Sequence, residues 1–503
     1  MSGLLSGRIL VDYFDRVTIL ERDDFSSGAH GRLGRKGVPQ GRHLHSLAAR
    51  GSEILERYFP GLDEELAAVG CPLVDQAQDF ITETSAGRLP RFRSGIMMRA
   101  VSRSLLEERL RRRLEKEPNV RLRSGSEVLG LVLAGNERVA GVRIRKAGGS
   151  PGLAEVLSAD LVVDASGQGS RAPRWLEEAG YRVPGEEVVD ARLGYASRWF
   201  KVPEGFSEDW EGISVLPGWP DNPRGGTLRR VEGGVWTAVL IGFGSDYPPT
   251  GDEGFLEFAR SLPSPSLHRA IESAEPVSRV YGYRRTANRR RSYEKARLPE
   301  GFLVTGDASC SLNPIYGTGM TGAALSAEAL DECLRERRRY APDDLAGLGR
   351  RFHRRQAAAV ASCWTLTANS DRLWAAQRIE DLNPARRLLH NLSGGVLSLA
   401  VEREDVARTL LEVKNLLKPP SALLRFGILL PAFRRAGLSL TKTHTAESKE
   451  SEESTKPLRK RVLFRTRSPV TSEKRDYAPD QTVSDVNGQL GENRTSALSK
   501  EAS

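Results

Sequence analysis

The N-terminal part of the chain shows a helix pattern that is followed directly by a strand pattern. Apolar side chains recur on one side of residues 4–14 at the spacing of an amphipathic helix. Residues 17–20 form a short apolar, partly β-branched run, which is typical of a buried parallel strand, and Glu21 ends it. Together the two patterns predict the second half of a β-α-β unit.

Helix and strand patterns continue to alternate up to about residue 190. Residues 99–117 predict a strongly charged amphipathic helix, and residues 161–163 predict a buried strand that ends at Asp164. Shorter helices are predicted at residues 48–58 and 62–69, and strands of a small sheet at residues 120–122, 127–133 and 139–145.

The pattern changes in the second half of the chain. Strand-like alternation with intervening Pro and Gly dominates residues 192–291, which predicts a second domain built on an antiparallel sheet. Residues 302–304 return to the buried-strand pattern, and helical spacing then runs from residue 319 to about residue 438. The tail that follows is rich in Ser, Thr, Glu, Lys and Arg and has no Trp, so we expect it to be disordered.

Composition excludes several classes of protein. The chain has 503 residues, with 75 Lys+Arg against 65 Asp+Glu and a net charge of +10. Both signs are mixed along most of the chain, unlike in a dedicated nucleic-acid binder, so we expect no nucleic-acid partner. None of the four cysteines forms a CxxC pair, and we expect no metal site. Few cysteines, no apolar window of ~20 residues and no signal-peptide pattern predict a cytoplasmic protein.

The segment from residue 301 to residue 325 carries the clearest chemistry. A buried strand runs into Gly306 and Asp307, and a loop with Pro314 then leads to Gly317-Thr318-Gly319 at the start of a helix. Glycines let backbone N–H groups approach a flat or anionic ligand, and the helix start adds partial positive charge. Asp307 is placed to accept hydrogen bonds from sugar-like hydroxyls. This set suits a flavin, and the alternative is a Gly-rich turn that only caps the helix.

The N-terminus matches part of a second cofactor motif. In a dinucleotide fold, a GxGxxG turn joins the first strand to the first helix, and an acid about 20 residues on holds the adenosine ribose. Gly3 and Glu21 correspond to the third glycine and to that acid, whereas the first strand and two glycines are missing. We expect that the gene product begins upstream of Met1; a real truncation that no longer holds FAD is the alternative.

Three stretches and one helix carry a family resemblance. They are RKGVPQGRHLH at residues 35–45, LVVDASGQGSR at residues 161–171, PEGFLVTGDASCSLNPIYGTGM at residues 299–320, and the helix at residues 99–114. The chain resembles the group A FAD-dependent monooxygenases of the hydroxybenzoate-hydroxylase fold over roughly residues 1–430. Within them it is most similar to the epoxidase branch, which includes squalene epoxidase and the bacterial polyether epoxidases.

The resemblance implies an α/β fold. It comprises a Rossmann-like FAD-binding domain whose first strand is truncated, an inserted antiparallel-sheet substrate domain and a C-terminal helical region. The expected boundaries are residues 1–190 and 296–340 for the FAD-binding domain, 191–295 for the substrate domain, 341–440 for the helical region and 441–503 for the disordered tail.

The resemblance also implies the cofactor site. Glu21 corresponds to the ribose acid, Arg103 to an arginine near the pyrophosphate and ribityl chain, and Asp307 to the acid that binds the ribityl hydroxyls. Arg35 and Lys36 lie in the loop that passes the FAD phosphates in relatives. The full set of expected cofactor-binding residues is Gly3, Glu21, Arg22, Arg35, Lys36, Arg103, Val128, Asp164, Gly167, Gly306, Asp307, Pro314, Gly317, Thr318, Gly319 and Met320.

One motif departs from the family pattern. The family has an Asp directly before the glycine of its DG motif, and this chain has Ser166 before Gly167, with Asp164 two residues earlier. This departure puts the usual contribution of the motif to FAD and nicotinamide handling in doubt. No second GxGxxG for a dedicated NAD(P)H domain occurs, which fits the family.

The implied reaction uses FAD, O2 and a reductant, either NAD(P)H or a partner reductase. A flavin C4a-hydroperoxide would transfer one oxygen atom to a small apolar alkene or aromatic substrate lying between the sheet of residues 192–291 and the flavin. We assign no catalytic acid or base. Alternatives are a flavin-dependent reductase of isoprenoid double bonds and a non-catalytic degenerate fold, whereas the absence of a WxWxIP segment argues against a halogenase.

Several residues keep two interpretations. His43 and His45 are either a proton shuttle or hydrogen-bonded loop histidines, and we favour the second. Cys310 is interpreted as a small buried residue. The arginines at 284–285 and 289–291 either hold a phosphate or mark an exposed strand end. A weak membrane-surface contact through residues 422–433 competes with a buried helix, which we prefer, and the oligomeric state stays open.

Overall fold

The structure is a computed structural model that describes residues 1–25, 34–35, 37–135, 137–148, 154–340, 344–376 and 378–436. Residues 1–441 form one compact unit, to which all elements below belong. The predicted disordered tail and Lys36 lie outside the described residues. The predicted domain boundaries within the unit stay predictions.

Two short parallel ladders are separate from the large sheet. Strand β1 (Val17–Leu20) pairs with β6 (Val120–Arg123), and β10 (Val162–Asp164) pairs with β18 (Phe302–Val304). Within the described residues the ladders remain separate two-stranded sheets. The three predicted buried strands are therefore found, and the expected gap in the parallel sheet lies between β1 and β10.

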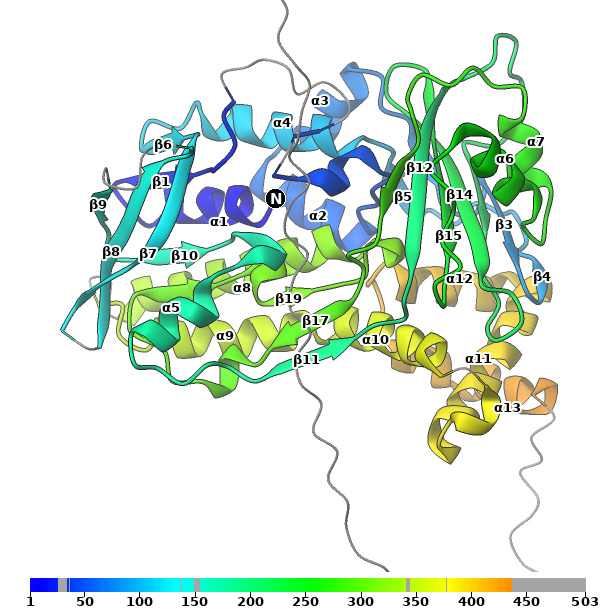
Figure 1. The fold of residues 1–503 in the computed structure, drawn as a ribbon. Helices are drawn as coiled ribbons and strands as arrows, with labels where there is room; N and C mark the ends of the chain where they lie inside the picture. Colours follow the sequence, from blue (N-terminus) through cyan, green and yellow to red (C-terminus); the bar gives the residue numbers. More distant parts are fainter. Residues whose placement is uncertain are drawn as a thin grey trace, which may run out of the picture. The chain divides into compact units, whose positions relative to one another are not determined.

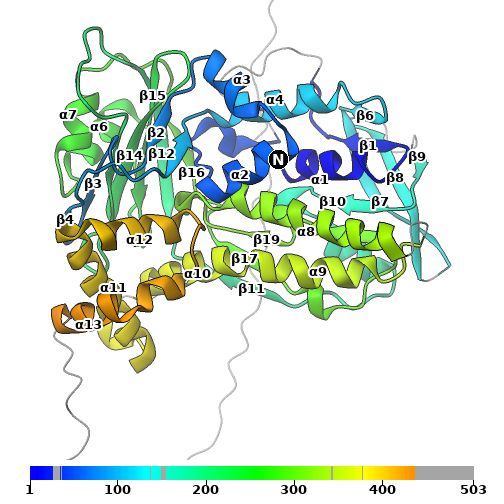
Figure 2. The same ribbon diagram turned by 180° about the vertical axis from the view of Figure 1, so that it is seen from behind.

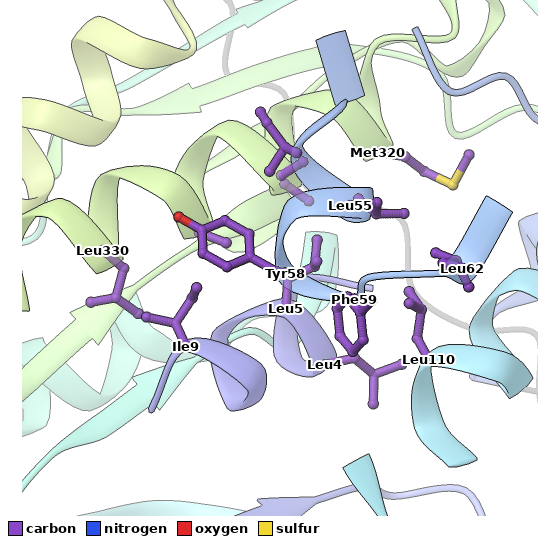
Figure 3. Packing of buried hydrophobic residues seen from close by; sticks show 14 of the residues in the cluster. Leu4, Leu5, Ile9, Leu55, Tyr58, Phe59, Leu62, Leu110, Met320 and Leu330 are labelled. Atoms are coloured by element: carbon purple, nitrogen blue, oxygen red, sulfur yellow. The ribbon is translucent and has the colours of Figure 1, made fainter. Parts of the chain in front are cut away.

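Helices cover these ladders and supply most of the core. Helix α1 (Ser2–Val11) packs on α8 (Gly319–Tyr340), which also contacts α2 (Ala49–Tyr58) and α9 (Leu348–Ala359). Figure 3 shows Leu5 and Ile9 of α1 beside Tyr58 and Leu330. Helix α4 (Arg103–Leu114) corresponds to the predicted charged helix, and Ser102 caps its N-terminus with a hydroxyl that accepts a hydrogen bond from the Leu105 N–H.

The small sheet differs from the prediction in one strand. It consists of β7 (Ser126–Ala134), β8 (Arg138–Lys146) and β9 (Glu155–Ser158). The strand at residues 120–122 was expected there, but it is β6 and pairs with β1 in the first ladder. Alternation within a strand gives the face of each side chain but not the partner strand, which is why the prediction was wrong.

The large sheet has seven strands in the order β16-β12-β15-β14-β13-β3-β4. Its strands are β16 (Tyr281–Tyr283), β12 (Gly194–Lys201), β15 (Val235–Gly242), β14 (Arg224–Val231), β13 (Gly212–Val215), β3 (Phe80–Thr84) and β4 (Gly87–Arg88). It is antiparallel except for the parallel pair β13–β3. Two of its strands, β3 and β4, come from before residue 190 and were not part of the predicted sheet. Helices α6 (Asp252–Arg260) and α7 (Ser266–Ile271) flank one face of this sheet (Figure 1).

Smaller elements and the C-terminal helices complete the unit (Figure 2). Two further sheets join β2 (Leu73–Asp75) with β5 (Met97–Arg99), and β11 (Glu186–Val189) with β17 (Asn288–Arg291) and β19 (Cys310–Ser311). The remaining helices are α3 (Leu62–Ala68), α5 (Ala172–Glu178), α10 (Ala361–Ala375), α11 (Pro384–Glu402), α12 (Glu404–Lys414) and α13 (Phe426–Arg435).

Helix α13 covers most of the stretch in which a membrane contact or a buried helix was expected. Ile428 and Ala432 are buried against the other C-terminal helices, whereas Phe426 is 89% exposed. Of the described helices, none combines the length and apolarity needed to cross a bilayer. The preferred interpretation and the surface contact both stay predictions.

The core around α1 gives a stability prediction. Leu5 is fully buried, so Leu5→Ala leaves a cavity and should lower the free energy of unfolding by about 2–5 kcal/mol. Leu388→Ala, at a position on α11 that is 42% exposed, should change it by less than about 0.5 kcal/mol. Urea unfolding of both variants measures the difference, and equal losses would contradict this packing.

Candidate cofactor site

One large cavity, of about 2570 Å³, gathers most of the predicted cofactor-binding residues. It runs along α1, β1 and β10 to the start of α8. Its lining includes Gly3, Glu21, Arg22, Arg35, Arg103, Val128, Asp164, Gly167, Asp307, Pro314, Gly317, Gly319 and Met320. Gly306 and Thr318 lie beside this lining in the same loop without forming part of it, and Lys36 lies outside the described residues.

The separation of the two parallel ladders shapes this cavity. Residues of both β1 and β10 line it, each along the strand edge that no described strand pairs with. Val162 and Val163 of β10 are therefore only partly buried, whereas the side chains of β18 are fully buried. Among the described residues, β1 and β10 thus each have an edge without a pairing strand and both line the cavity.

Asp307 is the most informative group in the cavity. It follows β18 in a short 3-10 turn, and no described residue gives its carboxylate a hydrogen bond or an ion pair. Burial raises the pKa of Asp307, while Arg103 and the N-terminal amine lower it. Asp307 is half-buried, and a carboxylate that is withdrawn from water gains stability from hydrogen-bond donors; the ribityl hydroxyls of FAD are donors of the required kind.

The loop between β18 and α8 ends in a cradle for a flat ligand. Gly317 has φ +68°, and a Cβ there would lie 2.9 Å from the Ser46 Cβ. Helix α8 begins at Gly319, where nothing lies within 4 Å of an added Cβ, and the buried Thr318 hydroxyl has no hydrogen-bond partner in the described structure. Free helix N–H groups, an orphaned hydroxyl and an open glycine face fit the pyrimidine side of a flavin.

Gly306 brings this loop close to α1. Its φ is +59°, and a Cβ at this position would lie only 1.9 Å from the Ser2 hydroxyl. Only glycine combines the positive φ with such a close approach without strain. Gly306 therefore sets where Asp307 lies relative to the first helix.

The acidic residue at the end of β1 is already ion-paired. Arg35 lies 2.9 Å from Glu21, 2.8 Å from Asp23 and 2.7 Å from Glu107. The amino terminus, Arg103 and Arg35 hold the pKa of Glu107 well below its usual range, against the effect of burial. Arg35 thus clamps the Glu21 end of β1 to α4 while it lines the cavity, and its expected place beside the FAD phosphates stays a prediction. Arg103, buried at the start of α4, is 3.3 Å from Glu107 and lines the cavity.

Asp164 is engaged within its own loop. Its carboxylate accepts hydrogen bonds from the Ser166 N–H at 2.9 Å and from the Ser170 hydroxyl at 2.5 Å. Gly167, with φ +80° and nothing within 4 Å of an added Cβ, lines the cavity. The departure at Ser166 therefore leaves the loop ordered, with Asp164 as its internal acceptor.

A buried carboxylate that the sequence analysis missed holds the loop before α8. Asp371 of α10 is fully buried and accepts hydrogen bonds from Asn288 (2.6 Å), Asn313 (2.9 Å) and the Tyr316 hydroxyl (2.7 Å). Burial, with a smaller contribution from Asp190, raises the pKa of Asp371 and the three hydrogen-bond donors lower it, so that the net pKa is about 6. The sequence signal that could have identified Asp371 is its helical spacing. It lies on the same face of α10 as Trp364 and Ala368, and both of these side chains are buried.

The histidines are hydrogen-bonded to protein groups. His43 Nδ1 is 2.8 Å from the Ser197 hydroxyl, and His45 Nε2 is 2.8 Å from the Gln40 carbonyl oxygen. Burial lowers the pKa of His43 to about 4 and that of His45 to about 3, so both rings are neutral near pH 7. This geometry supports the second interpretation, and only His45 of the two lines the cavity.

The other residues with two interpretations are Cys310 and the arginines at 284–285 and 289–291, and most of them are either unreactive or in contact with protein groups. Burial raises the pKa of the Cys310 thiol to about 12, so the reactive thiolate is scarce. Arg289 and Arg291 pair with Glu186, and Arg290 pairs with Glu294. Arg284 lies over the Tyr247 ring, whereas Arg285 lines the cavity.

The burial of Asp371 predicts a pH effect on stability. Because its folded-state pKa is raised to about 6 from 3.8, the wild type loses stability from this group as pH rises through about 6. Asp371→Asn does not titrate, so its stability relative to wild type should rise by up to about 3 kcal/mol between pH 4 and pH 7. Denaturant unfolding across this range measures the difference, and a flat difference would contradict the assignment.

The contact at Gly306 gives a second prediction. Gly306→Ala places a methyl group against Ser2 at a positive φ and should destabilise the protein by more than about 1 kcal/mol. Gly169→Ala has open space around the added Cβ and serves as the matched control. Thermal unfolding of the two variants compares them, and equal shifts would show that the close approach to α1 is absent.

Comparisons with known proteins agree with this architecture. No protein-family model matches the chain. Among solved structures, the flavin-dependent brominase Bmp2 has a TM-score of 0.58 at 15% identity and covers 87% of this chain and 95% of its own. The p-nitrophenol 4-monooxygenase PnpA of Pseudomonas putida DLL-E4 has a TM-score of 0.57 at 18% identity, over 82% of this chain and 95% of its own. The predicted α/β fold is confirmed, and it is the fold of these enzymes.

A curated protein is similar in sequence as well. Protein Rv3254 of Mycobacterium tuberculosis (strain ATCC 25618 / H37Rv) is 32% identical over 378 residues, which cover 74% of this chain and 78% of that protein. Identity at this level over most of both chains means a shared fold and descent. The chain belongs to the family of Protein Rv3254.

Proposed function

We propose that this protein is an FAD-dependent monooxygenase, an oxidoreductase that uses O2 to place one oxygen atom on an organic substrate. The observation that carries the proposal is the half-buried carboxylate of Asp307, which has no described partner and lines the same cavity as the open N-terminus of α8. The fold shared with the brominase Bmp2 and the monooxygenase PnpA supports the same class of cofactor and reaction.

Each part of the cavity has a binding task toward FAD. The Asp307 carboxylate accepts hydrogen bonds from the ribityl hydroxyls, and Arg103 offsets negative charge on the phosphates. The N–H groups at Gly317–Gly319 stabilise negative charge on the pyrimidine side of the ring. The bound cofactor supplies the activation of O2, and the protein supplies orientation, charge and exclusion of water.

The inner face of the large sheet supplies an apolar wall. Tyr195, Val239 and Ile241 are buried there, and Leu44 and Ile315 from the two loops beside the cavity pack against them. Ile315 lies between Pro314 and Gly317, so this wall adjoins the cradle at α8. We propose that an apolar alkene or aromatic part of the substrate lies against it, as in the epoxidase branch that the sequence resembles, and that NAD(P)H is the electron donor.

The four cysteines are unpaired in the structure. Structural disulfides are characteristic of oxidising compartments, and we therefore place the enzyme in the cytoplasm.

The cofactor assignment predicts the behaviour of the purified protein. Protein prepared without added flavin should show flavin absorbance, and denaturation should release FAD that chromatography identifies. Asp307→Ala should weaken FAD binding about tenfold or more, because it removes a charged acceptor of hydrogen bonds. Asp209→Asn changes an exposed carboxylate outside the cavity and should bind FAD as wild type does.

The redox assignment is tested separately. NAD(P)H oxidation coupled to O2 consumption would support a monooxygenase, and a hydride-transfer reaction without O2 uptake would favour the reductase alternative. A colourless protein that does not take up added FAD would contradict the proposal and support the non-catalytic alternative.

A further inference from the structure

The edge strand of the large sheet carries cations and aromatic rings in alternation. Strand β16 ends the seven-stranded order and pairs only with β12 among the described strands (Figure 2). Side chains alternate between the two faces of an extended segment. Every second residue from 279 to 285 therefore shares one face, and these residues are Arg279, Tyr281, Tyr283 and Arg285. We call this set the β16 row.

The inner end of the β16 row lies at the cofactor cavity. Tyr283 and Arg285 both line this cavity. The centre of the Tyr283 ring is 5.3 Å from that of Tyr195 and 5.7 Å from that of His43. Tyr195 belongs to the apolar wall of the large sheet, so the row begins where this wall adjoins the cavity.

Two guanidinium groups meet at the outer end of the row. The guanidinium carbon of Arg42 is 5.2 Å from the centre of the Tyr281 ring, and that of Arg279 is 5.1 Å from it. The loop before β12 is fixed to the sheet at this point, because the Arg42 carbonyl oxygen accepts a hydrogen bond from Trp199 Nε1 at 2.9 Å. The Arg279 side chain is exposed, so it can turn toward an anion that Arg42 also contacts.

These cations have no acidic partner in the part of the chain that the structure describes. No described carboxylate lies within ion-pair distance of Arg42, Arg279 or Arg285, and Asp252 at the start of α6 already pairs with Arg198 at 2.8 Å. Positive charges that converge without a counter-ion repel one another, and an anion between them removes this repulsion. The row is therefore complementary in charge to an anionic ligand.

The length and the order of the row fit a dinucleotide. An extended chain advances by up to about 20 Å over the six steps from residue 279 to residue 285, which is comparable with the length of an extended dinucleotide. The row has a cation at each end and two aromatic rings between them. Arginine matches the geometry of phosphate groups, and aromatic side chains stack on the rings of nucleotides.

From these contacts we propose that the β16 row, together with Arg42, binds the electron donor of this enzyme and selects NADPH over NADH. The proposal rests on the proposed function, because it takes the donor to be a nicotinamide dinucleotide. Arg42 and Arg279 bind the 2′-phosphate that distinguishes NADPH, and Arg285 binds the pyrophosphate at the cavity. This orientation directs the nicotinamide end of the donor toward the cradle at α8.

The test compares two adenosine nucleotides that differ only in the 2′-phosphate. The probes are adenosine 2′,5′-bisphosphate and adenosine 5′-monophosphate, and calorimetry on the purified protein measures their affinities without relying on a flavin signal. Wild type should bind the bisphosphate about tenfold or more tightly, because only the bisphosphate gains charge-assisted hydrogen bonds from Arg42 and Arg279. Arg279→Gln and Arg42→Gln should each weaken the bisphosphate about tenfold and leave the monophosphate unchanged.

The matched control lies in the same segment. Arg284 is exposed like Arg279 but belongs to the opposite face, where it lies over the Tyr247 ring, so Arg284→Gln should leave both affinities unchanged. Equal affinities for the two nucleotides, no binding of either, or a bisphosphate affinity that Arg284→Gln lowers as much as Arg279→Gln does would overturn the proposal. Because the Arg279 side chain is exposed, this variant decides the question even where Arg42→Gln disturbs its loop.

Two outcomes separate this binding site from the flavin assignment. If the protein holds no FAD but still prefers the bisphosphate through Arg279, the site is supported and the proposed function fails. If the protein holds FAD and consumes O2 with NADH as readily as with NADPH, the proposed function stands and the selection of NADPH by the β16 row is overturned.

Discussion

The candidate site depends on one buried carboxylate that fixes a loop. Asp371 reaches from α10 and holds Asn313 and Tyr316 at either end of the turn before Gly317, and Asn288 of β17 closes the same network. A fully buried acid is tolerated only when its oxygens are hydrogen-bonded. The cluster therefore stabilises the one loop conformation in which all three donors reach Asp371. The position of the α8 N-terminus, and with it the cradle for a flat cofactor, follows from that geometry.

Charge is distributed unevenly around this loop. On the β1 side, Arg35 forms ion pairs with Glu21, Asp23 and Glu107, and Arg103 lies 3.3 Å from Glu107, so each of these acids has a cationic partner within the protein. On the other side, the Asp307 carboxylate lines the cavity and has no described partner. Charged groups that pair with one another within the protein stabilise its structure. A charged group without a protein partner in a cavity marks a place where a ligand supplies the missing partner. The two kinds of group divide the cavity into a scaffold and a binding region.

Much of this protein is predictable from local patterns. The apolar runs at residues 17–20, 161–163 and 302–304 became β1, β10 and β18, and the spacing from Asp307 to Gly319 placed a strand, a turn and a helix start in order. Strand β6 was assigned to the wrong sheet, and strands β3 and β4 were missed, because pairing over long sequence distances leaves no local signal.

By itself, then, the sequence determined the elements, the order of the glycines and the acid that define the cradle, and the class of cofactor they suit. Those features depend on backbone preferences and short spacings, which are local properties of the chain. Only the tertiary structure decided that Arg35 pairs with three carboxylates and that Asp371 anchors the loop before α8. These relations join residues far apart in sequence, and their energies depend on burial, which exists only once the chain has folded.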